Sequence, residues 1–373
     1  MPIQEVRLSA RRLQQFAQLV PPGEMGEALQ SAAATRDRLA GRVLWQVNST
    51  AVGGGVAEML PPLLGYTRGT GVDARWVVID GDPEFFRITK RIHHALHGSR
   101  GDGTPLDEAA RRHYEEILAK NAEELCTVIR SGDVVFLHDP QTAGLGPALV
   151  SAGARVLWRC HIGHDTTNDE VEAGWKWLQP YLESIPLFVF SRQAYIPDYC
   201  DHGKSAIVTP SIDVFSPKNQ DLDEATVRSI LVQADLVDGP APAERPPLFW
   251  CDDGSPERVC RRAEVVREGR APAWETPLVL QVSRWDPLKD PVGVMRGFVE
   301  LLEKRSGDDV ELVLAGPSTE GVADDPEGAS VLEEVIATWR ELPESLRERI
   351  HLASLPTDDV AENAAIVNAL QRH

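Results

Sequence analysis

The sequence has little positive charge for its size. Of its 373 residues, 38 are Lys or Arg and 57 are Asp or Glu, which gives a net charge of −19. An acidic surface of this kind repels nucleic acid phosphates and anionic lipid unless a local basic patch intervenes. We therefore expect no nucleic acid partner and no membrane partner. An anionic ligand would have to be held by a few well-placed cations and by backbone N–H groups.

Paired cysteines and long apolar runs are also absent. The five cysteines, Cys126, Cys160, Cys200, Cys251 and Cys260, never form a Cys-x-x-Cys pair, so their spacing fits neither a zinc site nor a disulfide framework. No apolar run approaches the roughly 20 residues that a membrane helix needs. The first stretch, "MPIQEVRLSARRLQQFAQLV", has no apolar segment followed by a small-residue cleavage site,. These absences predict reduced thiols, no metal site and a cytoplasmic location.

Short apolar runs alternate with helical patterns through the first part of the chain. Near-continuous apolar strands joined by helical crossovers are typical of a parallel sheet covered on both faces. We predict a doubly wound α/β domain over residues 1–212. Its predicted strands are Val43–Val47, Ala74–Ile79, Asp133–Leu137, Arg155–Cys160, Pro186–Phe190 and Ala206–Thr209, and its predicted helices include Pro83–His97, Asp107–Ile129 and Glu170–Glu183.

The alternation stops and then resumes. Residues 213–276 are rich in proline, glycine and charge, which predicts a linker and an irregular insertion with one or two short helices at most,. Residues 277–373 read as a second, shorter Rossmann-like domain. Its predicted strands are Pro277–Val282, Val310–Ala315 and Arg349–Ala353, and its predicted helices are Pro291–Lys304, Ser330–Arg340 and Thr357–Arg372. The sequence therefore predicts two Rossmann-like domains facing a cleft, the second of them incomplete.

Three adjacent glycines lie between a predicted strand and a predicted helix in "VNSTAVGGGVAEML", residues 47–60. The spacing is not G-x-G-x-x-G, which disfavours a dinucleotide site. A tight turn with positive φ would explain one or two glycines, whereas three in a row favour close approach of a ligand to the backbone. Gly53, Gly54 and Gly55 are therefore candidate binding residues, with Asn48 nearby.

A pair of cations follows another strand, in "LQVSRWDPLKDP", residues 280–291. Ligands of open α/β sheets bind outside the carboxyl ends of the strands, where Arg284 and Lys289 would stand. A guanidinium fork and an ammonium point charge suit a diphosphate. The alternative is a pair of surface cations matched with Asp286 and Asp290, which would contribute little to stability.

Two further strands end in histidine. His161 ends the strand in "VLWRCHIGHDTTND", and "FLHDPQTAGL" puts His138 and Asp139 at the end of another strand. A lone buried histidine is more often structural than functional, and His164 fits a simple loop residue. The position of His161 at a strand's carboxyl end favours a functional role.

Seven motifs in order resemble one family. They are "VNSTAVGGGVAEML", "HDPQTAGL", "WRCHI", "VFSRQAYIP", "PSIDVFSPKN", "QVSRWDPLKDP" and "LAGPS". Together they resemble the trehalose synthase (glycosyltransferring) and retaining trehalose phosphorylase branch of the family-4 retaining glycosyltransferases. The resemblance covers nearly the whole chain from about residue 42, apart from the insertion. It implies a GT-B type fold, metal-independent chemistry and no cofactor, with a nucleotide-diphosphate glucose donor and glucose as acceptor.

The resemblance also implies roles for single residues. Arg284 and Lys289 would neutralise the leaving diphosphate, and His161 would support the anomeric centre of the donor sugar. Donor and acceptor binding would involve the glycine loop with Asn48, His138 with Asp139, and Gly316 of "LAGPS". Retention would follow from front-face attack, with the leaving phosphate taking the acceptor proton, unlike the two-carboxylate scheme of retaining glycosidases.

The sequence departs from the family after "HLASLPTDDVAENAAIVNALQRH". Relatives continue with a further strand and a Glu-x7-Glu segment that holds the donor, so we expect a chain truncated at its carboxyl end, either a fragment or a natural short form. In the expected strand order, "PLVLQVS" would then present a bare apolar edge. Three functions stay open: a trehalose-forming transferase, a phosphorylase using glucose 1-phosphate, and an inactive sugar- or partner-binding remnant. The oligomeric state also stays open, with a homodimer among the alternatives.

Overall fold

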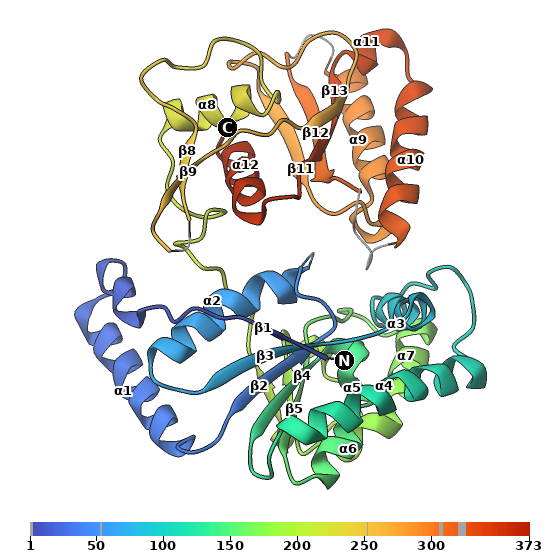
Figure 1. Ribbon diagram of the computed structural model, residues 1–373. Coiled ribbons are helices and arrows are strands. Elements are labelled where there is room, and N and C mark those ends of the chain that lie inside the picture. Colours follow the sequence, from blue (N-terminus) through green and yellow to red (C-terminus); the bar gives the residue numbers. More distant parts are fainter. Residues whose placement is uncertain (1–2, 53, 252, 306–308, 320–325) are drawn as a thin grey trace. The chain divides into compact units, whose positions relative to one another are not determined.

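The computed structural model describes residues 3–52, 54–251, 253–305, 309–319 and 326–373 (Figure 1). The chain divides into two compact units, Met1–Ser211 and Ile212–His373, and each is described by itself. Across the described residues, no helix combines the length and the apolar character needed to cross a membrane.

The first unit is built on a seven-stranded sheet of order β1-β3-β2-β4-β5-β6-β7. All neighbouring strands are parallel except β1, which runs antiparallel to β3. The direction of winding reverses between β2 and β4, and ligands of such sheets bind at the carboxyl ends beside that point. The strands are β1 (Ile3–Val6), β2 (Leu44–Asn48), β3 (Ala74–Ile79), β4 (Val134–His138), β5 (Arg155–Cys160), β6 (Leu187–Phe190) and β7 (Ser205–Ile207).

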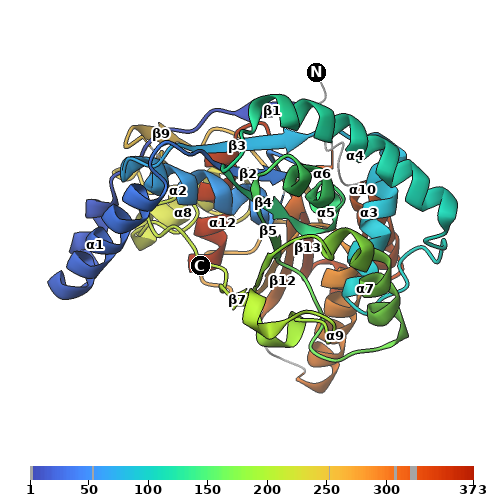
Figure 2. The ribbon, with the colours of Figure 1, turned by 90° about the horizontal axis from the view of Figure 1, so that it is seen from below.

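Helices cover both faces of this sheet (Figure 2). They are α1 (Pro22–Arg38), α2 (Gly55–Gly69), α3 (Pro83–Leu96), α4 (Glu108–Val128), α5 (Asp139–Ala143), α6 (Gly146–Ser151) and α7 (Asp169–Leu182). The larger core, on the face covered by α3 to α7, contains Trp158, Trp175 and Phe190. On the opposite face, α2 packs Leu60 against Trp76 of β3.

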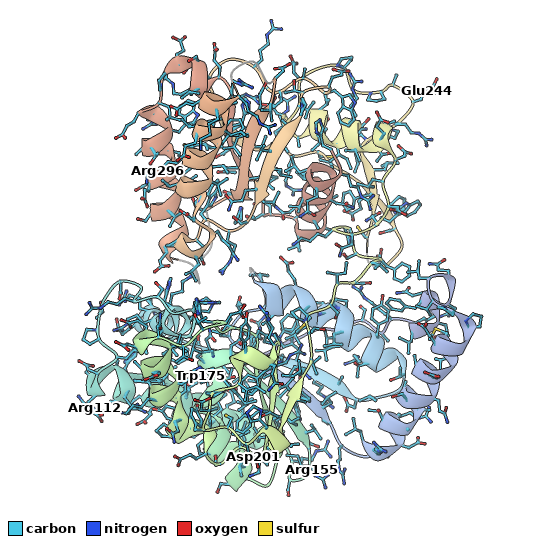
Figure 3. All side chains as sticks on the ribbon, turned by 180° about the vertical axis from the view of Figure 1, so that it is seen from behind. Arg112, Arg155, Trp175, Asp201, Glu244 and Arg296 are labelled. Carbon is cyan, nitrogen blue, oxygen red and sulfur yellow. The ribbon has the colours of Figure 1, made fainter. Side chains whose placement is uncertain are left out.

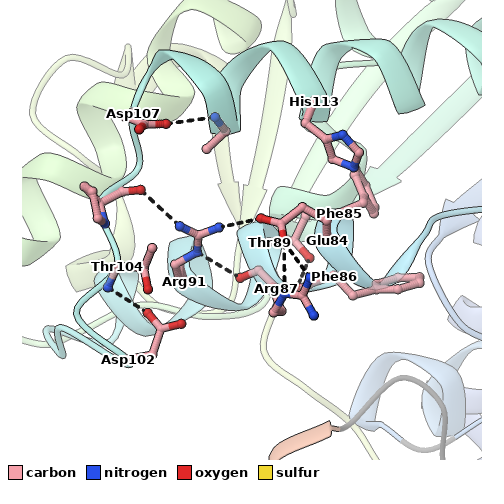
Figure 4. A network of polar contacts seen from close by, with 12 residues as sticks. Glu84, Phe85, Phe86, Arg87, Thr89, Arg91, Asp102, Thr104, Asp107 and His113 are labelled. Carbon is pink, nitrogen blue, oxygen red and sulfur yellow. Dashed lines mark hydrogen bonds and ion pairs between the residues drawn. The ribbon is translucent and has the colours of Figure 1, made fainter.

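A buried arginine ties the loop between α3 and α4 to α3 (Figure 4). The guanidinium of Arg91 donates to the Pro105 carbonyl at 3.0 Å and to the Glu84 carboxylate at 3.2 Å. The carboxylates of Asp82 and Asp107 accept backbone N–H groups in the first turns of α3 and α4. These caps satisfy helix donors that would otherwise lack partners, and so they define where α3 and α4 begin,.

The second unit has a four-stranded sheet of order β10-β13-β12-β11 and a separate hairpin of β8 and β9. The three parallel strands are β11 (Leu278–Val282), β12 (Glu311–Pro317) and β13 (Ile350–Leu355), and the short ones are β8 (Leu248–Trp250), β9 (Pro256–Arg258) and β10 (Glu264–Val266). The helices are α8 (Glu224–Gln233), α9 (Pro291–Lys304), α10 (Pro326–Arg340), α11 (Glu344–Arg347) and α12 (Val360–Arg372). As the expected strand order predicts, β11 lies at a sheet edge.

The predicted parallel strands of both units are confirmed, but the antiparallel strands of the described residues were not predicted. β1 pairs with β3, β10 pairs with β13, and β8 pairs with β9. Part of the segment expected to be an irregular insertion also packs into the second core, through Ile230 of α8, Phe249 of β8 and Val259. These apolar residues are too widely spaced along residues 213–276 to form a periodic pattern, so the sequence conceals their common burial.

Candidate active site

Asn48 is the last residue of β2, and its side chain forms hydrogen bonds within the protein. Its amide Nδ2 donates to the Thr50 carbonyl at 2.7 Å, and its Oδ1 accepts from Trp76 Nε1 at 2.7 Å. The residue is 4% exposed. Asn48 therefore anchors the start of the glycine loop, and a contact between its side chain and a ligand stays a prediction.

Gly54 and Gly55 leave the amino end of α2 open. Gly54 has φ −173°, an extended conformation that any residue adopts, and no side chain of the described residues caps the helix. A Cβ atom at either glycine would meet nothing within 4 Å. Positive φ therefore does not explain these two glycines, and close approach of a ligand to the first N–H groups of α2 stays a prediction,. Gly53 lies outside the described residues.

The two strand-end histidines contact each other. His138 ends β4, and its Nδ1 lies 2.9 Å from Nε2 of His161, which follows β5. The carboxylate of Asp139 accepts the backbone N–H of His161 at 2.7 Å. Asp139 itself has φ +58°, a conformation that non-glycine residues adopt at a cost and that is found at functional sites.

Burial governs the protonation of this cluster. It lowers the pKa of His138 well below its ordinary value, and the charges of His161 and Arg159 act in the same direction. Burial also lowers the pKa of His161, although Asp139 opposes this effect. Desolvation raises the pKa of the Asp139 carboxyl group. Both imidazoles are therefore neutral near pH 7.

Two polar members of the cluster were missed by the sequence analysis. Gln46 of β2 is 5% exposed, and its Oε1 lies 2.6 Å from His138 Nε2. Arg159 of β5 is 7% exposed and stands opposite His138 in the β4–β5 register. Its buried Nε has no hydrogen-bond partner among the described residues. The available signal was a polar side chain inside an otherwise apolar strand, a feature with little weight until its neighbours are known.

The cations of the second unit lie on the loop between β11 and α9. Arg284 is partly exposed, and its Nη2 lies 3.4 Å from Oδ2 of the buried Asp286. Lys289 is exposed at the end of a short 3-10 helix, Pro287–Lys289, and its carbonyl accepts from Gln281 Nε2 at 2.8 Å. Of the two ion pairs in the alternative interpretation, in which Asp286 and Asp290 match the cations, the Arg284–Asp286 contact is thus present. Asp290 instead caps α9 by accepting the Gly293 N–H.

Gly316, near the carboxyl end of β12, has a packing role. A Cβ atom at this position would lie 2.5 Å from Trp285 Cε2 and 2.9 Å from the Ser283 carbonyl oxygen. Trp285 Nε1 in turn donates to the Pro317 carbonyl at 2.9 Å. Glycine is needed here for the indole to pack on the strand, and a role of Gly316 in ligand binding stays a prediction.

The predicted site residues thus form two groups, one in each unit. In the first unit, Asn48 ends β2, and Gly54 and Gly55 lie at the start of α2. The adjacent ends of β4 and β5 bring together His138, Asp139 and His161. The second group comprises Arg284, Lys289 and Gly316 at the ends of β11 and β12. Within the described ranges, no three His, Cys, Asp or Glu side chains are arranged to hold a metal ion.

Comparison with known proteins identifies similar sequences. The family described as "Trehalose synthase, N-terminal domain" matches residues 46–197. The trehalose synthase of Pyrococcus horikoshii is 30% identical over 370 residues, which cover 99% of this chain and 74% of that protein. A trehalose phosphorylase of Pleurotus sajor-caju is 27% identical over 346 residues, which cover 86% of this chain and 44% of that protein.

The fold has solved counterparts. A UDP-forming α,α-trehalose-phosphate synthase from Burkholderia xenovorans, crystallised with glucose-6-phosphate, matches with a TM-score of 0.58 at 16% identity. The match covers 87% of this chain and 77% of that one. The two Rossmann-like units are therefore of the GT-B type. With this fold and the 30% identity over 99% of its length, the chain belongs to the trehalose synthase family of glycosyltransferases.

Proposed function

We propose that this protein is a retaining glycosyltransferase that moves glucose from a nucleotide-diphosphate glucose to glucose and so forms trehalose. Membership of the trehalose synthase family supports the reaction class. The observation that carries the choice of donor is the pair of cations, Arg284 and Lys289, on the loop between a parallel strand and the helix that follows it. In a chain of net charge −19, two cations at that point suit a diphosphate,.

The chemistry is a single substitution at the anomeric carbon of the donor. The bond from this carbon to the diphosphate oxygen breaks, and a bond to the anomeric hydroxyl oxygen of the acceptor glucose forms on the same face. The acceptor proton passes to the leaving phosphate, so the products are trehalose and the nucleoside diphosphate. Negative charge grows on the leaving group, and preorganised cations stabilise it more in the transition state than in the ground state.

The residues of the first unit would bind the sugar and its phosphate. The open amino end of α2 would receive sugar or phosphate oxygens through its first N–H groups, beside Gly54 and Gly55,. His161 would contact the donor sugar, with His138 and Asp139 holding its ring and backbone. The nucleotide sugar is a substrate, and we propose that transfer needs neither a metal nor another cofactor.

The test is an assay with UDP-glucose or ADP-glucose and glucose. We expect a non-reducing disaccharide whose two anomeric centres are both α by proton NMR, at a rate that EDTA leaves unchanged. Failure to form this product with any nucleotide donor would refute the proposal. The phosphorylase function has a separate signature, which is phosphate-dependent breakdown of trehalose to glucose and glucose 1-phosphate without any nucleotide. Calorimetry adds a third arm, because donor binding without turnover would identify a sugar-binding protein.

A further inference from the structure

A chain of three side chains runs from the sheet interior to the strand ends of the first unit. Gln46 Oε1 lies 2.6 Å from His138 Nε2, and His138 Nδ1 lies 2.9 Å from His161 Nε2. Gln46 and His138 are 5% and 2% exposed, whereas His161 is partly exposed. Gln46 lies in β2, His138 ends β4 and His161 directly follows β5. These three strands are neighbours in the sheet. The chain therefore leads from buried groups to a group that a ligand can reach.

The donor and the acceptor of each hydrogen bond in this chain follow from the number of protons that its side chains carry. An amide oxygen only accepts, so His138 Nε2 carries the proton of that imidazole. A neutral imidazole has one N–H, so His138 Nδ1 is a lone pair and must accept. His161 Nε2 is then the donor, and His161 Nδ1 is the nitrogen that is left without a proton.

Both imidazole rings are expected to be neutral, so each carries one N–H. Burial lowers the pKa of each histidine, and the nearby guanidinium of Arg159 adds to this effect at both. The carboxylate of Asp139 acts on His161, and its Oδ1 accepts the His161 backbone N–H, which fixes that residue's main chain. Among the described residues, no group hydrogen-bonds His161 Nδ1.

We propose that Gln46 and His138 are positioning residues that hold His161 as its Nε2–H tautomer, so that Nδ1 is a fixed acceptor for a hydroxyl group of the bound sugar. The choice of a sugar hydroxyl rests on the proposed function, whereas the tautomer does not. An acceptor that is already oriented loses no free energy to tautomer exchange on binding. In this arrangement the His161 side chain accepts a hydrogen bond from the substrate and does not donate one to it.

Nitrogen NMR of the protein labelled with ¹⁵N-histidine tests the tautomer without requiring activity. The His161 signals are assigned by their loss in His161→Gln. We expect Nε2 to show the shift of a protonated nitrogen and Nδ1 that of a lone-pair nitrogen. The reverse pattern would mean that the Gln46 amide faces the other way, and it would overturn the proposal.

Two variants and a control separate positioning from simple packing. Gln46→Met removes the acceptor at similar size, and we expect mixed His161 tautomers and a kcat/KM about tenfold lower. His138→Gln retains one donor and one acceptor, so we expect it to preserve the Nε2–H tautomer of His161. Thr142→Val removes a buried hydroxyl that donates to the backbone carbonyls of His138 and Asp139, and it should leave the tautomer unchanged. An unchanged tautomer in Gln46→Met would overturn the proposal, provided that circular dichroism shows a folded variant.

The ligand arm uses glucose, trehalose, UDP-glucose and ADP-glucose, with binding measured by calorimetry in parallel. Binding that moves the Nδ1 resonance towards the protonated range supports the acceptor role. Binding that leaves Nδ1 unmoved overturns that role. If none of these sugars binds, the proposed function fails and takes the sugar-hydroxyl assignment with it, while the tautomer is still decided by the spectrum of the free protein.

Discussion

The guanidinium of Arg284 lies 3.4 Å from the carboxylate of Asp286, a side chain that is only 2% exposed. The same carboxylate also accepts the Leu288 N–H at 2.9 Å. Asp286 thus shapes the loop after β11 and orients a cation that it contacts at the long end of the hydrogen-bond range. A guanidinium oriented in this way has the planar fork geometry that suits an anionic ligand.

Replacement of Arg284 should therefore impair turnover more than folding. We expect Arg284→Ala to lower kcat by about 10²–10³-fold, the usual effect of losing one charge-stabilising donor. Arg284→Lys should recover only part of this loss because an ammonium lacks the two-pronged geometry. Initial rates of disaccharide formation provide the measurement. Arg296→Ala, at an exposed position on α9 (Figure 3), is the matched control and should retain the wild-type rate; equal losses in both variants would contradict the assignment.

Side chains added to the open end of α2 should block ligand access without unfolding the protein. A Cβ atom at Gly55 meets nothing within 4 Å, so Gly55→Val should leave the free energy of unfolding within about 1 kcal/mol of the wild-type value,. It should raise KM for the donor or acceptor at least tenfold. Gly69→Ala, at the other end of the same helix, is the structural contrast, because its Cβ atom would lie 1.7 Å from the Arg11 carbonyl oxygen. Urea titration and steady-state kinetics separate the two effects, and an unchanged KM in Gly55→Val would argue against a ligand at this end.

The Trp285 contact predicts that Gly316→Ala destabilises the second unit. The added methyl group would lie 2.5 Å from the indole, and overpacking of this kind typically costs about 1–3 kcal/mol,. Gly297→Ala is the opposite case, because it lies within α9 with no atom near its Cβ and should stabilise by about 0.5–1 kcal/mol,. Denaturant unfolding followed by tryptophan fluorescence checks both. Equal stability of the two variants would contradict the packing role of Gly316.

Asp133 gives the first unit a pH-dependent contribution to stability. Burial raises the pKa of its carboxyl group, but hydrogen bonds from the Val43 and Arg130 N–H groups and from Trp45 Nε1 outweigh this and hold the pKa below its ordinary value. The folded-state pKa is therefore the lower one, so this stabilisation is complete well above pH 4 and is lost as pH falls through the folded value.

Asp133→Asn should accordingly lower the free energy of unfolding by about 1–3 kcal/mol at pH 7, because the new NH₂ group faces donors. The difference from wild type should shrink as pH falls below about 4. Urea titrations across that range measure it. Asp37→Asn, at an exposed ion pair with Arg36, should show a much smaller difference at every pH,; a pH-independent gap in Asp133→Asn would refute the linkage.

The sequence was sufficient for the parallel strands because they are largely apolar runs bounded by turn residues, as in Pro186–Phe190. It was not sufficient for β1 and β10, with four and three residues, because such short edge strands form only where a neighbouring strand offers unpaired backbone groups,. The contact between His138 and His161 was also out of reach. The residues could be assigned to strand ends, but the register that sets β4 beside β5 decides whether two strand-end side chains meet.

The edge position of β11 has a consequence for amide hydrogen exchange. Successive residues of β11 turn their backbone N–H and C=O groups to opposite sides, so that every second residue faces β12. No other described strand lies on the outer side. Protection along β11 should therefore rise and fall with a period of two residues, while β12, paired on both sides, should be protected throughout,. The strand that precedes the Arg284 loop should thus exchange more of its amide protons with solvent than its neighbour β12,.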